Sequence, residues 1–408
     1  MRRISKIAGI GLGAVVAVTG AAALAVEIGG IPRYDVERVD LRVERTPARL
    51  ARGKKLASIL CVGCHADPVT GRLTGRPLVD VPAKFGAVTS RNITRHSDKG
   101  IGSWTDGEIA YLLRTGVARD GRYLPPWMIK LPHMADDDLQ SIIAFLRSED
   151  PLVAAADVDP PGATRPSFLT KLLCWVAFKK LPYPSHPIEA PPAADKVAHG
   201  RYLVTALDCY GCHSASWQTM NIAEPERSAG FLGGGNVLTD LRGKPIRSAN
   251  LTPDETGIGR WSQADLSRAL RQGFRPDGTP IRAPMAPMPQ LTDDEVGALR
   301  AYLRTVPPIR NPVPRSLEGD QVSADAPPGK RLYYKYACVS CHGDSGAGGQ
   351  ADLRRAGEHF PNRLALEAWI RNAPGIKPET RMPAWQGVIA DADYEPLIAY
   401  VLALGQKR

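Results

Sequence analysis

One five-residue pattern, Cys-x-x-Cys-His, occurs three times in this chain of 408 residues and constrains what it can fold into. The copies run from Cys61 to His65, from Cys209 to His213 and from Cys338 to His342. Cysteines three residues apart lie on one side of a helical turn, where both thiols can bond to the vinyl groups of a haem. The pattern is typical of c-type haem attachment, with the adjacent histidine as an axial ligand of the iron.

Structural zinc is the alternative interpretation, because zinc sites also use paired cysteines and histidine. Zinc ribbons repeat the cysteine pair after about 15–20 residues, whereas here the copies begin 148 and 129 positions apart. We therefore predict three covalently attached haem c groups. Their attachment points are Cys61, Cys64, Cys209, Cys212, Cys338 and Cys341, and their proximal iron ligands are His65, His213 and His342.

The seventh cysteine, Cys174, is left without a partner for a disulfide within the chain. Its neighbours Leu172, Leu173, Trp175 and Val176 are apolar. This setting predicts a buried, inert thiol rather than a reactive one.

An internal repeat relates the first two motif regions. Asn92-Ile93-Thr94 and Gly100-Ile101-Gly102-Ser103-Trp104 recur as Asn250-Leu251-Thr252 and Gly257-Ile258-Gly259-Arg260-Trp261, at an offset of 157 or 158. A Gly-x-x-Leu also precedes each of the three motifs, beginning at Gly53, Gly200 and Gly329. This glycine predicts a short helix that lets another helix pass closely.

Methionine is the common second ligand of the iron in cytochromes c, and the repeat offset selects among the candidates. Met128 corresponds to Met285, whereas Met134 corresponds to Leu291 and Met288 to Leu131. Because leucine cannot bind iron, we predict Met128 and Met285 as ligands, with Met288 as the rival in the second region. In the third region Met382 is the methionine that follows the motif. Ligation by two histidines is the alternative, with candidates His96, His133, His186, His199 and His359.

The ends of the motif regions read as helices. Asp136-Asp137-Asp138-Leu139 and Thr292-Asp293-Asp294-Glu295 each open a helical pattern, and Thr292 and Glu295 have the spacing of a capping box. The predicted fold class is therefore mainly α, with three cytochrome c-like domains in tandem after an N-terminal hydrophobic helix. The boundaries are 1–30 for a signal peptide or anchor, 45–150, 195–310 and 327–408 for domains (units one, two and three), and 151–194 and 311–326 for linkers.

The N-terminal segment predicts export. Arg2, Arg3 and Lys6 precede an uncharged stretch from Ile7 to Val26, long enough to span about 30 Å as a helix. Small residues such as Ala21-Ala22-Ala23 also suit a cleaved signal peptide. Either reading places the remainder on the periplasmic side of a bacterial inner membrane.

Two further features concern partners. The net charge is +10, but Lys and Arg are scattered along the chain, so no nucleic-acid-binding face is indicated. The first linker contains an apolar run from Phe168 to Phe178, too short to span a bilayer. It predicts a buried linker helix or a docking surface for a partner or the membrane interface.

With these motifs and repeats, residues 45 to 405 resemble the triple-haem cytochrome c subunit of bacterial membrane-bound alcohol, gluconate and sugar dehydrogenases. The resemblance implies a partner subunit, dependent on flavin or pyrroloquinoline quinone, that oxidises the substrate. The cytochrome subunit would then pass electrons toward ubiquinone or a downstream redox protein, without being an enzyme itself. The alternatives are a stand-alone or oxidase-linked multihaem cytochrome, and a haem enzyme such as a peroxidase.

Overall fold

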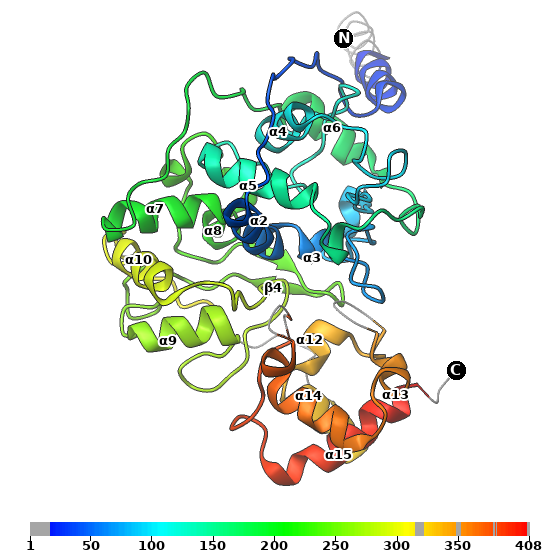
Figure 1. Cartoon of the computed structure of the whole chain (residues 1–408), viewed down its shortest axis with the longest axis vertical. Helices are drawn as coiled ribbons and strands as arrows, with labels where there is room; N and C mark the ends of the chain where they lie inside the picture. Colours follow the sequence, from blue (N-terminus) through cyan, green and yellow to red (C-terminus); the bar gives the residue numbers. More distant parts are fainter. Residues whose placement is uncertain (1–16, 315–321, 348–351, 378–379, 381, 406–408) are drawn as a thin grey trace, which may run out of the picture.

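The computed structural model of the chain describes residues 17–314, 322–347, 352–377, 380 and 382–405, and it is mainly helical, as predicted (Figure 1). Each Cys-x-x-Cys-His motif forms its own short helix. A helix before the motif packs against the last helix of the same unit. In units one and two these helices are α2 (Pro47–Leu60), α3 (Val62–His65), α4 (Asp106–Thr115), α5 (Asp136–Leu146), α7 (Lys196–Ala206), α8 (Cys209–His213), α9 (Gln263–Ser267) with the π-helical turn η5 (Arg268–Gln272), and α10 (Asp293–Leu303).

The third group of helices lies at the opposite end of the molecule from the N-terminal helix (Figure 1). Its members are α11 (Pro328–Lys335), α12 (Cys338–His342), α13 (Ala356–His359), α14 (Arg363–Ile376) and α15 (Asp391–Leu404). Between units one and two runs α6 (Phe168–Val176). The strands are two-residue or three-residue pieces, β1 (Gly86–Ala87) pairing antiparallel with β2 (Arg165–Pro166), and β3 (Val237–Thr239) with β4 (Pro245–Arg247).

The glycine of each Gly-x-x-Leu sits where two helices cross, as predicted. A Cβ atom added to Gly53, Gly200 or Gly329 would lie 1.8, 1.9 or 2.1 Å from a backbone carbonyl oxygen of α5, α10 or α15, respectively. No side chain fits in that space. Glycine therefore fixes how closely α2, α7 and α11 approach the last helix of their unit.

Side chains at the helix starts explain where the helices begin. The predicted capping box at Thr292 and Glu295 is present, with each side chain bonded to the other residue's backbone N–H. A capping box also begins α4, and another begins α9 with aspartate in place of glutamate. Acidic side chains in these first turns also face the positive end of the helix dipole.

Units one and two share a continuous apolar core, whereas unit three has a core of its own. The contact between units two and three is local: the rings of Phe274 and Trp385 meet edge to face with centroids 5.1 Å apart. Unit three thus has a separate core, although it touches unit two.

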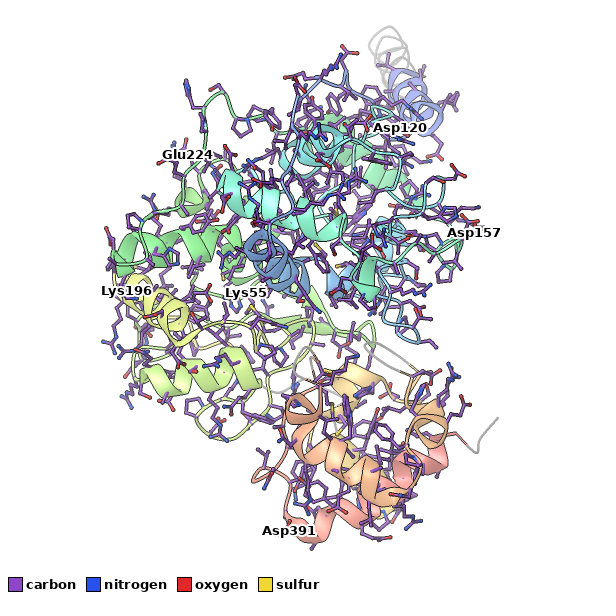
Figure 2. All side chains as sticks on the ribbon, in the orientation of Figure 1. Lys55, Asp120, Asp157, Lys196, Glu224 and Asp391 are labelled. Carbon is purple, nitrogen blue, oxygen red and sulfur yellow. The ribbon has the colours of Figure 1, made fainter. Side chains whose placement is uncertain are left out.

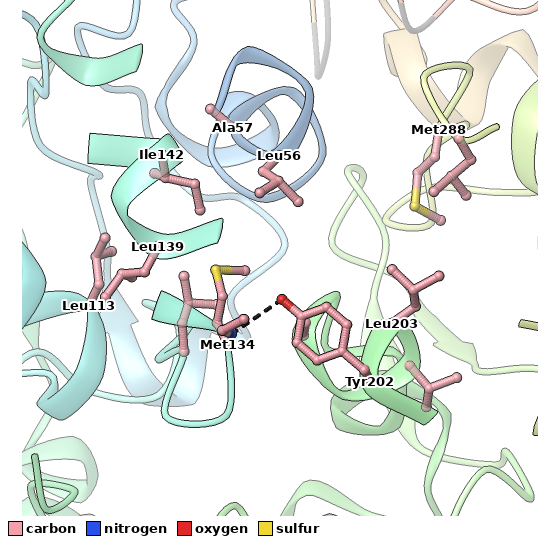
Figure 3. Packing of buried hydrophobic residues seen from close by; sticks show 14 of the residues in the cluster. Leu56, Ala57, Leu113, Met134, Leu139, Ile142, Tyr202, Leu203 and Met288 are labelled. Atoms are coloured by element: carbon pink, nitrogen blue, oxygen red, sulfur yellow. Dashed lines mark hydrogen bonds between the residues drawn. The ribbon is translucent and has the colours of Figure 1, made fainter. Parts of the chain in front are cut away.

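Polar side chains join units one and two through their packed helices. Arg52 on α2 bonds to Asp138 on α5 and to Glu295 on α10, the latter at 3.0 Å. Lys55 also pairs with Glu295, and the Tyr202 hydroxyl donates to Asp138 at 2.5 Å. Figure 2 labels Lys55 at the centre of the molecule, and Figure 3 shows the Tyr202 hydroxyl reaching across to unit one.

These contacts have a two-fold relationship. Lys55 and Tyr202 each lie two residues after a crossing glycine, and Asp138 and Glu295 are each the third residue of the last helix. The contacts run crosswise, from Lys55 to Glu295 and from Tyr202 to Asp138. In an interface with two-fold symmetry, position i of one unit contacts position j of the other, and position j of the first contacts position i of the second. The two contacts here follow this pattern.

The N-terminal segment is described from residue 17, and residues 17–29 are helical. Among the residues that the structure describes, none of the helices combines the length and the apolar character needed to cross a membrane. Of the predicted signal peptide or anchor over 1–30, residues 1–16 lie outside the described residues, and these include positions 7–16 of the apolar stretch.

Candidate haem-attachment sites

The three motif helices place their cysteines and histidine on one turn. In α3 the N–H groups of Cys64 and His65 both bond to the carbonyl of Cys61, at 3.1 and 2.9 Å. Burial raises the pKa of Cys61 to about 12, with a further contribution from the neighbouring Cys64. Cys209 and Cys338 have the same pKa of about 12, also because of burial. All six motif cysteines are free of disulfides, so their thiols are available for thioether bonds.

The proximal histidines of units one and two are held by the same hydrogen bond. Nδ1 of His65 lies 2.8 Å from the carbonyl oxygen of Arg91, and Nδ1 of His213 lies 2.8 Å from that of Ala249. A carbonyl oxygen only accepts, so the proton is on Nδ1 and the lone pair is on Nε2. Burial lowers the pKa of both rings and keeps them neutral. A neutral imidazole bonded through Nδ1 is the form that ligates a metal through Nε2.

The repeated Asn-x-Thr segments position these carbonyls, a role that sequence reasoning did not foresee. Asn92 follows Arg91 directly; its side-chain N–H donates to the carbonyl of Ala156 at 3.0 Å. Its side-chain oxygen accepts from the backbone N–H of Thr94 at 2.9 Å and from the Thr94 hydroxyl at 2.7 Å. Asn250, which follows Ala249, makes the equivalent bonds. The available signal was that Asn-x-Thr recurs at the same offset, 157 or 158 residues, as the Gly-Ile-Gly-x-Trp segment that follows it.

Backbone hydrogen bonds confirm the repeat offset of 157 around the predicted distal loops. The N–H of Leu131 donates to the carbonyl of Leu113 at 2.7 Å, and the N–H of Met288 donates to that of Leu270 at 2.7 Å. Met288 therefore takes the structural place of a leucine. Three residues further on, the N–H of Met134 donates to the carbonyl of Leu131, and the N–H of Leu291 donates to that of Met288. These bonds align Met134 with Leu291 in the same way.

The candidate methionines occupy two kinds of environment. Met134 and Met288 are buried in the shared core, where Figure 3 shows them among leucine and isoleucine side chains. Met128 and Met285 are half-buried in bends that directly follow proline-containing turns. Met382 is also half-buried in a bend, and its N–H donates to the Thr380 hydroxyl at 3.2 Å. This arrangement supports Met128, Met285 and Met382 as ligands, which remain predictions.

Three of the competing histidines already have hydrogen-bond partners. His133 bonds through Nε2 to the carbonyl of Ile222 at 2.7 Å. His199 bonds through Nδ1 to Pro191, and Nδ1 of His96 accepts from the N–H groups of residues 98 and 99. The zinc alternative would need four ligands around the metal. Within the described ranges, no group of three or more His, Cys, Asp or Glu side chains is arranged to hold a metal ion.

A haem also fits an orphaned donor in unit three. The indole N–H of Trp385 is buried and has no hydrogen-bond partner among the described residues. An unsatisfied buried donor costs about 1–3 kcal/mol. Because Trp385 lies three residues after Met382, a haem propionate is an acceptor that would satisfy it. The thiols, the neutral histidines and this donor together suit haem c, which would supply a one-electron redox centre.

The helical fold and these sites agree with c-type cytochrome domains, and two parts of the chain match families of such domains. Residues 197–307 match the family described as "Cytochrome c". Residues 324–401 match the family described as "Cytochrome C oxidase, cbb3-type, subunit III". Haem c in units two and three is therefore supported by these matches, and a third haem in unit one remains a prediction from its motif.

Comparison with characterised proteins confirms the resemblance to cytochrome c subunits of bacterial dehydrogenases. The chain is 28% identical to the cytochrome c subunit of alcohol dehydrogenase (quinone) from Gluconacetobacter polyoxogenes, over 71% of this chain and 63% of that protein. It is 30% identical to the fructose dehydrogenase cytochrome subunit of Gluconobacter japonicus, over 65% and 55%. It is 28% identical to the gluconate 2-dehydrogenase cytochrome c subunit of Pantoea cypripedii, over 74% of this chain and 70% of that protein.

The matched region spans somewhat less than two thirds of the length of the alcohol and fructose dehydrogenase subunits. Each of the three relatives is named as a cytochrome subunit of a dehydrogenase. This agrees with the prediction that the chain is an electron-transfer subunit and that substrate oxidation belongs to another protein.

Proposed function

We propose that this chain is the triple-haem cytochrome c subunit of a membrane-associated dehydrogenase complex on the periplasmic side of the inner membrane. It receives electrons from a dehydrogenase subunit that depends on flavin or pyrroloquinoline quinone. It passes them to ubiquinone or to a downstream redox protein. The similarity to cytochrome subunits of alcohol, fructose and gluconate dehydrogenases supports the kind of partner.

The observation that carries the proposal is the matched setting of His65 and His213. Both rings donate from Nδ1 to a backbone carbonyl at 2.8 Å, which leaves Nε2 as the metal-binding nitrogen. The polypeptide thus holds each proximal ligand in one tautomer and one orientation. With methionine as the second ligand, each iron would be six-coordinate and would exchange electrons without binding a substrate.

The test uses the haem-loaded full chain and the dehydrogenase subunit that co-purifies from gently solubilised membranes. We expect the cytochrome to be reduced only when this subunit and its substrate are both present, and to be reoxidised by a quinone analogue. Intact mass should show three covalently bound haems. A protein with bound zinc and no haem would contradict the proposal.

A saturated iron also predicts poor carbon monoxide binding and negligible peroxidase turnover by the reduced protein alone. Rapid carbon monoxide binding to one native haem, together with substrate turnover without a partner, would favour a haem enzyme instead. That experiment separates the relay from the peroxidase alternative.

One comparison favours a second candidate acceptor. Residues 324–401 match a family described as a subunit of a cbb3-type cytochrome c oxidase, so unit three could deliver electrons to a terminal oxidase. If the reduced protein were reoxidised by a purified terminal oxidase and not by a quinone analogue, the oxidase-linked function would replace the quinone route.

A further inference from the structure

The linker helix α6 (Phe168–Val176) is oriented opposite to an ordinary surface helix. Its buried residues are Thr170 and Cys174. Phe168, Leu169, Trp175 and Val176 are exposed, and Val176 has 66% of its surface accessible. Positions i, i+1, i+7 and i+8 lie on one side of a helix. The outward face of α6 is therefore apolar, and its inward face carries a hydroxyl and a thiol.

Hydrogen bonds fix this orientation. The Thr170 hydroxyl donates to the carbonyl of Phe85 at 2.7 Å, and the Ser167 hydroxyl donates to the carbonyl of Lys84 at 2.7 Å. The strand pair β1–β2 attaches the residues just before the helix to unit one. The polar side of α6 is thus bound to the protein, so rotation of the helix to bury its apolar side would break these bonds.

The exposed face continues onto the helix over residues 17–29. The Trp175 indole N–H donates to the carbonyl of Gly30 at 2.9 Å, and Lys171 forms an ion pair with Glu27. Val18, Leu24 and Ile28 on that helix are exposed as well. Figure 1 shows the two helices together at one end of the molecule, with the helices of unit three at the other.

We propose that the outward face of α6 and the exposed side of helix 17–29 form a membrane-docking surface that lies on the bilayer. This surface contacts anionic phospholipid at the boundary between the headgroups and the acyl chains. Four observations favour lipid: Phe168, Leu169 and Val176 are exposed, the face includes a tryptophan, Lys179 and Lys180 flank it, and it continues onto the helix over residues 17–29. The inference rests on the proposed location at the periplasmic membrane surface.

Docking through this surface would orient the molecule. Unit one, which holds α6 through its hydrogen bonds, would lie next to the lipid, and unit three would point away from it (Figure 1). The surface is thus an interfacial contact made by two helices side by side, distinct from a span across the bilayer.

The test places an environment-sensitive NBD dye at Val176→Cys in the haem-loaded full chain. The matched control is Leu364→Cys on α14, where the native side chain is 76% exposed in unit three. Native Cys174 is buried, and in the haem-loaded protein the motif cysteines would be held in thioether bonds, so labelled wild type supplies the background. Each protein is bound to vesicles of phosphatidylethanolamine and phosphatidylglycerol, with or without bromine on the acyl chains.

We expect brominated lipid to remove most of the NBD emission at position 176 and to leave emission at position 364 unchanged. Quenching of the dye by haem does not affect the result, because the emission at each position is compared with and without brominated lipid. NBD emission at position 176 that is the same with and without brominated lipid would overturn the proposal. A change at 176 only on adding the dehydrogenase subunit, or only with rising protein concentration, would overturn it in favour of a protein partner or a second copy. Haem content and reduction by the dehydrogenase subunit test the proposed function separately.

Discussion

Glu295→Gln tests whether the crosswise ion pairs hold units one and two together. Glutamine keeps the shape of the side chain and can still accept the capping-box bond from the N–H of Thr292. It removes the negative charge between Arg52 and Lys55, which both pair with Glu295. The Glu295 side chain is only 10% exposed, so water cannot fully replace the lost charge.

The magnitude follows from this burial. Loss of one partner from a fully buried ion pair costs about 3–5 kcal/mol. Because Arg52 keeps its second partner Asp138 and the network is partly solvated, we expect the free energy of unfolding to fall by about 2 kcal/mol. For a folding unit of this size each kcal/mol lowers the midpoint of thermal unfolding by about 2–4 °C, so the expected shift is about 4–8 °C.

The assay is thermal unfolding of the haem-loaded protein, followed by circular dichroism in the Soret region. Asp294→Asn is the control, because it removes a charge from the same helical turn but from a side chain that is 86% exposed and pairs with Lys196 at the surface. We expect little change from this control. Equal shifts for the two variants would refute the argument that burial at the interface sets the magnitude.

The same variant has a predictable pH dependence. Burial raises the pKa of Glu295, but bonds and charges from Lys55, Thr292 and Arg52 outweigh this and hold the pKa below its ordinary value. A carboxylate with a depressed pKa stabilises the folded state at neutral pH, and this stabilisation is lost as the pH falls through the folded-state pKa. The difference in unfolding midpoint between wild type and Glu295→Gln should therefore shrink on acidification.

Two further predictions concern helix crossing and ligation. Gly200→Ala should destabilise unit two by about 3 kcal/mol or more, because its Cβ would lie 1.9 Å from a carbonyl oxygen of α10. Gly297→Ala on α10, where the nearest atom is 3.4 Å away, should instead stabilise by about 0.5–1 kcal/mol, and urea titration measures both. Met128→Leu should remove one methionine–iron absorption band at the red end of the oxidised spectrum and lower one haem potential, while Met134→Leu should do neither. The reverse pattern would show that the repeat alignment misassigns the ligand.

Local features of the fold could be predicted from the sequence because they depend on residues close together or on exact repetition. The crossing glycines Gly53, Gly200 and Gly329 were found because Gly-x-x-Leu recurs before each motif, and the structure has a close helix contact at each one. The offset that pairs Met128 with Met285 was found in the same way. The capping box at Thr292 and Glu295 needs only residues three apart.

Features that depend on the packing of distant segments were not predictable. Lys55 and Glu295 are 240 residues apart, and nothing in either local sequence shows that they meet. The shared core of units one and two was missed for the same reason. The apolar run of α6 was recognised, but the sequence left open whether it faces inward or outward. The hydrogen bonds that decide this are accepted by the distant carbonyls of Phe85 and Lys84.

The two-fold relationship between units one and two has a consequence for how such a chain could arise. An isologous contact is what two identical copies form when they dimerise, and joining the copies in one chain converts that dimerisation into an intramolecular step at high effective concentration. Once they are joined, the two halves are free to diverge. Lys55 and Tyr202 now occupy equivalent places with different chemistry, and Asp138 and Glu295 occupy equivalent places with carboxylate side chains of different length. In a dimer of identical subunits the two haems would have identical protein surroundings. In the fused and diverged pair, the surroundings of the two haems can differ.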